Sequence, residues 1–304
     1  MIAVPKNPYS TREFIKFFLK VFRPKFESSL DPNYTKRTWK FSDASATENT
    51  KIGFVGDILP ARKNTLEFSQ DIIDFFADCD YVVGNFEGII SNQASLPFIQ
   101  KHTADILTQL LKIKPANRWI LSLANNHVMD FGEDAFFETK KTIEEFGMRA
   151  IGLKDSCSIE LTENITLHTW TEWINGESDL VEKSSPLTST PNDEKTHIAY
   201  PHWGYEFESF PRKEQIESMP THYQLVVGHH PHFIQPIQFI KNTPIAWSLG
   251  NFATEIKKTI MQEGRILKAT INLDESNQSR VQSLDVRNLN IDVLDGISSI
   301  CLKD

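Results

Sequence analysis

The chain has few cysteines, no long apolar run and no excess of positive charge, and each absence excludes a class of protein. Its three cysteines, Cys79, Cys157 and Cys301, lie far apart and form no Cys-x-x-Cys pair, which argues for reduced thiols and against a disulfide framework. No run approaches the roughly 18 apolar residues of a membrane span. The net charge of −8 argues against a nucleic-acid surface. With 304 residues, the chain can form one large α/β domain or at most two domains.

The N-terminal region, residues 1–48, differs from the rest of the chain. In residues 11–25, phenylalanines and aliphatic residues interleave with lysines and arginines until Pro24, which predicts a short basic, aromatic-rich helix; residues 26–48 are polar and predicted to be a linker. The helix either packs on the globular domain or contacts an anionic membrane surface. Vesicle co-sedimentation that is unchanged after deletion of residues 11–25 would exclude the membrane contact. Because basic residues interrupt its apolar stretch, it does not resemble a cleavable signal, and we expect a cytoplasmic or peripheral membrane location.

Residues 49–304 are predicted to form one α/β domain. Strands and helices alternate up to about residue 150, short strands dominate beyond it, and a polar loop over 174–195 is predicted to be mobile. The predicted strands are 51–56, 81–83, 119–123, 149–152, 158–161, 165–170, 197–200, 223–227, 244–249, 265–273 and 280–293. The predicted helices are 65–77, 103–112 and 133–146, with a further one from about residue 211. In an open α/β sheet, functional residues gather beyond the carboxyl ends of the strands.

Polar side chains suited to binding metal follow many of these strands. The most concentrated group is Gly228-His229-His230-Pro231-His232, where a buried strand stops at three imidazoles within four residues. The strand-end groups are Asp57, Asn85, Glu87, Asn126, His127, His202, His229, His230, His232 and Asn251. Carboxylate, amide and imidazole donors together suit Mn²⁺, Fe or Zn²⁺ better than Ca²⁺. Two metals that share a carboxylate would support hydrolysis of a phosphate ester.

Each of these residues also has a simpler interpretation. Asp57 and Asn251 could cap the turns after their strands, Asn126 could cap a helix, and His202 could be a core histidine beside Trp203. To explain the whole set without a metal site, these interpretations would all have to hold together, each at its own strand end, and this weighs against them as a group.

The strand-end motifs also occur in a specific order. They are Gly56-Asp57, Asn85-Phe86-Glu87-Gly88, Ala124-Asn125-Asn126-His127 with Asp130 and Gly132, His202-Trp203-Gly204 with Glu206, Gly228-His229-His230-Pro231-His232, and Ser248-Leu249-Gly250-Asn251-Phe252. As an ordered set over about residues 51–254, they closely resemble the CapA family of bacterial capsule and poly-γ-glutamate synthesis proteins, within the calcineurin-like metallophosphoesterase superfamily. The resemblance implies a four-layer α/β/β/α sandwich, in which two mixed sheets face each other and helices cover the outsides.

The resemblance also implies a ligand set for one or two divalent ions per chain, of Mn, Fe or Zn, with Mn favoured. The implied ligands are Asp57, Asn85, Glu87, Asn126, His202, His230 and His232. Among them, Glu87 is favoured as the bridging carboxylate, with Asn85 as its neighbour or a weak ligand. Members of the superfamily often carry a histidine two residues after the first aspartate. Leu59 occupies that position here, so one of the two metals would have one imidazole ligand fewer than in those members.

By the same resemblance, His127 would steady the transition state or protonate the leaving group, and Arg62 would orient the substrate. His229, Asn251 and Glu206 would contact the ligands or the substrate. The function implied is a metal-dependent hydrolase of a phosphomonoester or phosphodiester, with a metal-bound hydroxide as nucleophile and an anionic small molecule or polymer as substrate. Two alternatives remain open: a protein that builds or trims a capsule or poly-γ-glutamate type polymer, and a metal-containing binding module without turnover.

Overall fold

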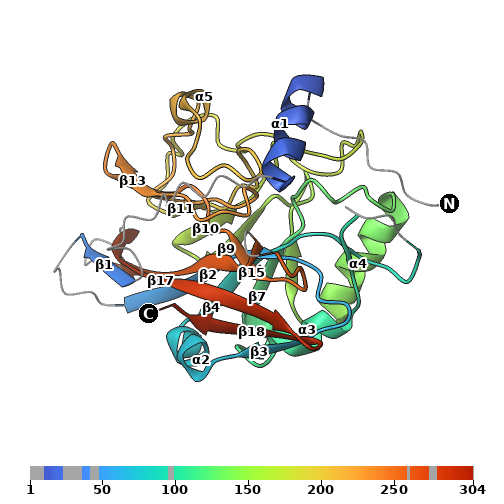
Figure 1. The fold of residues 1–304 in the computed structure, drawn as a ribbon. Helices are drawn as coiled ribbons and strands as arrows, with labels where there is room; N and C mark the ends of the chain where they lie inside the picture. Colours follow the sequence, from blue (N-terminus) through green and yellow to red (C-terminus); the bar gives the residue numbers. More distant parts are fainter. Residues whose placement is uncertain are drawn as a thin grey trace.

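The computed structural model describes residues 10–22, 36–41, 48–94, 99–258, 261–273 and 279–303, and its two mixed β-sheets lie face to face (Figure 1). The larger sheet runs, in spatial order, β3 (Thr65–Phe68), β18 (Ile297–Leu302), β17 (Ser279–Leu294), β16 (Glu263–Leu273), β2 (Glu48–Ile58), β4 (Tyr81–Phe86), β7 (Trp119–Ser122) and β8 (Arg149–Ile151). In addition, β1 (Lys36–Lys40) pairs with β17, and β15 (Asn251–Ala253) pairs with β2.

The smaller sheet runs β13 (Ile237–Ile240), β14 (Thr243–Ala246), β12 (Leu225–Val227), β11 (Thr196–Ala199), β10 (Ile165–His168) and β9 (Ser158–Thr162). A two-stranded ribbon of β5 (Ile89–Ile90) and β6 (Lys101–His102) lies apart from both sheets. The helices are α1 (Thr11–Phe22), α2 (Gln70–Ala77), α3 (Asp105–Leu110), α4 (Glu133–Glu145) and α5 (Lys213–Glu217), with a 3₁₀ turn at Ala116–Arg118.

Alternation of side chains along the strands produces separate apolar layers on the two faces of each sheet. In β4, Val83 points into the core between the sheets, where it joins Leu167 and Ile198 of the smaller sheet. The neighbouring Val82 points the other way, into the core that α2, α3 and α4 form against the larger sheet. Each fully buried side chain of this kind stabilises the fold by roughly 1.5–3 kcal/mol relative to exposure.

The outer face of the smaller sheet is covered by a layer of loops and α5. Val226 of β12 packs there with Trp170, Trp247 and Tyr223, and Met219, two residues beyond α5, closes the same cluster. The chain therefore forms the four layers that the resemblance implies, and this prediction is confirmed, although short α5 and loops make up the fourth layer (Figure 1).

Two predictions of local structure were wrong, because pairing with distant strands overrides local preference. Residues 36–40, predicted as linker, form β1. Strand β18 pairs with β17 only over residues 289–294 of β17, so the edge of β17 over residues 283–287 is free to pair with β1. The segment predicted as a helix over 65–77 starts as a strand, because Thr65–Phe68 pairs in parallel with β18. Helix α2 then begins only at Gln70.

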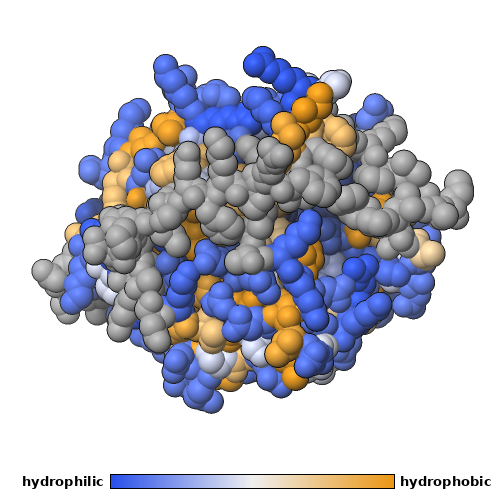
Figure 2. Space-filling view, in the orientation of Figure 1, coloured by the Kyte–Doolittle hydropathy of each residue, from blue (hydrophilic) through white to orange (hydrophobic). Residues whose placement is uncertain are grey.

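Helix α1 forms as predicted over Thr11–Phe22. Glu13 forms an ion pair with Arg212 at 2.9 Å, and this hydrogen bond, aided by Lys16, lowers the pKa of Glu13 to about 2. The side chains of Ile15 and Leu19 are 55% and 59% exposed, and apolar atoms of α1 reach the surface (Figure 2). Within the described ranges, no helix has the length and apolarity needed to cross a bilayer. The predicted membrane contact of residues 11–25 stays a prediction.

We expect His102 to make the fold sensitive to acid. Its ring is fully buried and stacked on Phe86, with centroids 4.0 Å apart, and burial is the main cause that lowers the pKa of His102 to about 3. Below pH 6.5, the unfolded chain binds a proton that the folded chain excludes, so this histidine's contribution to stability is lost as pH falls. The free energy of unfolding should drop by about 1.4 kcal/mol per pH unit from this group between pH 6.5 and about 4. Urea titrations at pH 7 and pH 4.5 would measure the slope, and an equal slope in His102→Phe would contradict the assignment.

Candidate metal centre

The sheet registers bring the ends of distant strands to one place. Asp57 near the end of β2 pairs with Asn85 on one side and with Asn251 on the other. Beyond the ends of β11 and β12, His202 and His229 pair with each other as an isolated bridge. All five of these residues are fully buried. The prediction that the polar side chains after these strands meet at one place is therefore confirmed for these segments.

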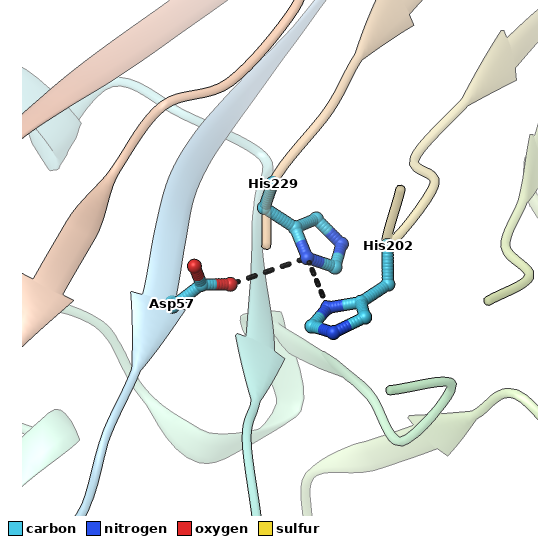
Figure 3. Close-up of side chains that lie close together, drawn as sticks. All are labelled: Asp57, His202 and His229. Atoms are coloured by element: carbon cyan, nitrogen blue, oxygen red, sulfur yellow. Dashed lines mark hydrogen bonds and ion pairs between the residues drawn. The ribbon is translucent and has the colours of Figure 1, made fainter. Parts of the chain in front are cut away.

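Two carboxylates and four imidazoles form the centre of this site. His229 lies between Asp57 and His202: its Nδ1 is 3.2 Å from Asp57 Oδ1 and 3.0 Å from His202 Nδ1 (Figure 3). Three overlapping groups each have one ligand atom per residue, all within 4.8 Å of one another: Asp57, His202 and His229; Glu87, His202 and His230; and Asp57, Glu87 and His232. Because residues are shared between the groups, the geometry is compatible with more than one ion.

Several buried polar atoms of the cluster have no hydrogen-bond partner among the described residues. They are Glu87 Oε1, His229 Nε2 and both ring nitrogens of His230. Buried polar atoms in folded proteins are nearly always hydrogen-bonded or bound to an ion or water. Carboxylate oxygens and imidazole nitrogens are the donors that bind divalent transition metals. The residues present therefore fit a divalent metal ion.

The charged groups of the cluster shift one another's pKa values. Burial alone would raise the pKa of Asp57, but hydrogen bonds from His229 and His232 outweigh it, and the pKa lies well below its usual range. Burial, followed by the charge of Asp57, raises the pKa of Glu87 well above its usual range. Burial lowers the pKa of His232, but Glu87 and Asp57 outweigh this effect and raise it to about 10. With both carboxylates ionised, the site needs a cation beside them, whether an imidazolium or a metal.

His202 and His230 are kept in the neutral form that binds metals. Burial is the main cause that lowers the pKa of each ring well below its usual value, and neighbouring histidines add to the effect. A neutral imidazole has a free lone pair, so such a ring does not have to lose a proton before it binds an ion.

The loop after β12 has an unusual backbone. His230 and His232 have positive φ angles of 103° and 57°, a conformation that costs non-glycine residues of order 1–3 kcal/mol each. Before them, a Cβ atom on Gly228 would lie 2.1 Å from Trp203 Nε1 and 2.4 Å from Trp247 O, so only glycine fits. Strained backbone of this kind concentrates at functional sites, and here it aims the imidazoles toward the carboxylates.

The asparagines of the site orient its other members. Asn85 Nδ2 donates to Asp57 Oδ1 at 2.7 Å and to Glu87 Oε2 at 3.2 Å, while Asn125 donates to Asn85 Oδ1 at 3.3 Å. In this orientation the amide nitrogen of Asn85 faces both carboxylates and its oxygen faces Asn125. Asn126 Oδ1 lies 3.1 Å from His202 Nε2, so its oxygen faces the imidazole cluster.

His127 is held at the edge of the cluster by a carboxylate. Its Nδ1 lies 2.6 Å from Asp130 Oδ2, and its Nε2 lies 3.9 Å from Glu87 Oε1. Asn175 donates to Asp130 Oδ1 at 3.3 Å and lies equally far from His127 Nδ1. Sequence reasoning missed Asn175, because it lies in the polar loop over 174–195 and carries no motif. Asp130 belongs to one of the motifs on which the family resemblance is based, but no role was predicted for it.

The remaining predicted residues lie around the cluster. Asn251 Oδ1 is 3.0 Å from His232 Nδ1, and its amide donates to Met261 O, so Asn251 orients that imidazole. Glu206 acts through its charge on Glu87 and His232. Arg62 is 38% exposed and forms an ion pair with Glu255 at 2.7 Å. Its predicted role in orienting substrate stays a prediction.

Three comparisons with known proteins found similar families, relatives and structures. The profile of the family described as "Bacterial capsule synthesis protein PGA_cap" matches residues 51–165 and 180–255. The PGA biosynthesis protein CapA of Bacillus subtilis (strain 168) is 25% identical over 272 residues, which cover 77% of this chain and 70% of that protein. The capsule biosynthesis protein CapA of Bacillus anthracis is 26% identical over 262 residues, which cover 72% of this chain and 64% of that protein. The calcineurin-like phosphoesterase YfkN from Bacillus subtilis aligns in structure with a TM-score of 0.43 and 11% identity, over 79% of this chain and 90% of that one.

Proposed function

Since the chain belongs to the bacterial capsule synthesis protein family PGA_cap, we propose that it is a metal-dependent hydrolase of phosphate esters, whose active site is the cluster around Asp57, Glu87 and His230. The observation that carries the proposal is this group of two buried carboxylates and four imidazoles, several of whose ligand atoms accept or donate no hydrogen bond within the part of the chain that the structure describes. Such a donor set has little use in a protein that binds no cation, because burying two carboxylates together costs several kcal/mol.

The proposed ligands are the two carboxylates with the imidazoles of His202, His230 and His232, and the geometry supports His229 as a further candidate. A divalent ion held there would supply Lewis acidity, which polarises a phosphoryl oxygen and lowers the pKa of water. We favour manganese, because mixed oxygen and imidazole donors suit it.

The chain's own groups would act around that ion. Because the Asp130 carboxylate accepts a hydrogen bond from His127 Nδ1, the other ring nitrogen, Nε2, faces the cluster. When protonated, this nitrogen can donate its proton to a leaving oxygen or steady a charged transition state. Asn85 fixes both carboxylates through its amide nitrogen, and this prevents them from turning away from one another.

A second function is favoured by the names of the relatives, which are a PGA biosynthesis protein and a capsule biosynthesis protein. In this version, the same centre would act during the synthesis or trimming of an anionic polymer, on an amide or phosphate linkage. A third version, a binding module that holds metal without turnover, uses the same residues and differs only in rate. The substrate in each version is anionic, which suits a centre that carries a divalent cation.

The test begins with the purified chain of 304 residues and a count of metal per chain by element analysis. We expect one or two transition-metal ions per chain, and hydrolysis of p-nitrophenyl phosphate or its diester that stops with chelator and returns with Mn²⁺. Retained metal without turnover on either ester would support the polymer or binding versions. Absence of metal binding with Mn²⁺, Fe²⁺ and Zn²⁺ would refute all three.

A further inference from the structure

A hydrogen-bonded row of four side chains crosses the outer face of the smaller sheet, and the metal centre does not use it. Ser158 Oγ lies 2.7 Å from His168 Nδ1, His168 Nε2 lies 2.9 Å from His197 Nδ1, and His197 Nε2 lies 2.8 Å from Asp193 Oδ1. We call this row, Ser158, His168, His197 and Asp193, the serine relay.

The sheet itself places the relay. Ser158 on the edge strand β9 pairs with His168 of β10, and β10 runs parallel to β11, which carries His197. Leu167 and Ile198 point into the core between the sheets, so the adjacent His168 and His197 point outward. Both rings are nearly buried, whereas Ser158 is exposed and Asp193 is 40% exposed. The serine end is therefore open to a molecule from solvent, while the imidazoles behind it are shielded.

The direction of the hydrogen bonds follows from the acid at the far end. Burial would raise the pKa of Asp193, but the hydrogen bond from His197 outweighs it, so the carboxylate is ionised at neutral pH and can only accept. In the neutral form of His197 that the relay requires, the proton lies on Nε2 and Nδ1 accepts from His168. Burial, with the neighbouring His197, lowers the pKa of His168 to about 4, so that ring is neutral. With its proton on Nε2, His168 accepts the Ser158 hydroxyl proton at Nδ1.

We propose that the serine relay is a second, metal-independent reactive site, in which Ser158 is a nucleophile toward carboxylic esters and His168 is its general base. The arrangement has the three roles that covalent catalysis requires: a nucleophile, a base within hydrogen-bond distance and a group that orients the base. Ser158 Oγ bonds to the carbonyl carbon while its proton passes to His168 Nδ1. The alcohol then leaves with that proton, and water repeats the two steps to release the acid and restore the hydroxyl.

The test uses the full chain in excess chelator, so that any metal-dependent hydrolysis is silent. The probes are p-nitrophenyl acetate and a tagged fluorophosphonate, which loses fluoride when a serine attacks its phosphorus. We expect mass spectrometry to place the phosphonyl adduct on Ser158. Ser158→Ala should remove the adduct and the ester hydrolysis, while the exposed Ser189→Ala serves as the matched control and should keep both. His168→Gln should slow labelling by at least about 100-fold.

Asp193 is a positioning residue in this proposal and needs its own measurement. Asp193→Ala should slow the maximal labelling rate by about 10-fold or more, and Asp193→Glu should restore most of it. Both changes are at the surface, so they remain informative if His168→Gln fails to fold. No adduct on Ser158 in the wild-type chain, or labelling as fast in His168→Gln and Asp193→Ala as in the wild type, would overturn the proposal. Because the metal centre is chelated throughout, either result leaves the proposed phosphoesterase untouched.

Discussion

Replacing His230 by alanine should lower the hydrolysis of a p-nitrophenyl phosphate ester by about 10³-fold or more. The ring is fully buried and neither nitrogen has a hydrogen-bond partner among the described residues, so a metal ion is the partner that it would lose. A divalent ion supplies several kcal/mol of charge stabilisation in such reactions, and each 1.36 kcal/mol corresponds to a tenfold rate. Steady-state kinetics with saturating Mn²⁺ would measure the loss of rate, and element analysis of the variant would measure the loss of bound metal.

Glu87→Gln provides a second variant of the same centre with almost unchanged shape. Glu87 is fully buried and belongs to two of the three groups that could hold an ion, so loss of its charge should reduce activity at least as strongly. Glu163→Gln, at an exposed turn, is the matched control and should keep full activity.

A stability measurement separates metal binding from catalysis in these variants. Ligand binding to the folded state adds about 2.7 kcal/mol at a concentration 100 times the Kd. Mn²⁺ should therefore raise the Tm of the wild-type chain clearly and that of His230→Ala and Glu87→Gln much less. Full activity and an unchanged Mn²⁺-dependent Tm in both variants would show that the cluster is not the metal centre.

The sequence carried enough information to predict which strand ends meet. Asp57, His202 and His230 each follow a buried apolar run, and parallel strands bring such ends to one edge of a sheet. Their spacing alone did not show that the ends meet, and the ordered motifs supplied the missing arrangement. The same logic predicted Asn251 beside the cluster, and in the structure it is hydrogen-bonded to His232.

Features that depend on the loop backbone could not be predicted. His229 was expected to contact the ligands or the substrate; its Nδ1 lies between Asp57 and His202, since His229 pairs with His202 as an isolated bridge. The next turn of the chain has positive φ angles at His230 and His232. No local pattern in the sequence specifies these angles for histidine. Similarly, β1 and β3 form only because distant strands offer free edges, and a window of neighbouring residues contains no such information.

Removing the imidazole of His127 should lower kcat by about 10²–10⁴-fold while the metal content stays at the wild-type level. The ring lies at the edge of the cluster, with Nε2 3.9 Å from Glu87 Oε1, and it belongs to none of the three groups that could hold an ion. His127→Ala should therefore affect the chemical step more than metal binding. His222→Ala, in a histidine remote from the motifs, serves as the matched control.

The leaving group decides between the two roles proposed for His127. If the ring protonates the leaving oxygen, His127→Ala should lower kcat far more with a phenyl or alkyl ester than with a p-nitrophenyl ester, because p-nitrophenolate departs without a proton. If the ring only stabilises charge on the phosphoryl group, the decrease in kcat should be similar for all esters. Asp130, whose Oδ2 lies 2.6 Å from His127 Nδ1, can be replaced by asparagine, which keeps an acceptor but removes the carboxylate charge. Asp130→Asn should therefore lower kcat by a smaller factor and leave KM nearly unchanged. An unchanged kcat in His127→Ala on every ester would exclude both roles and leave catalysis to the metal ligands.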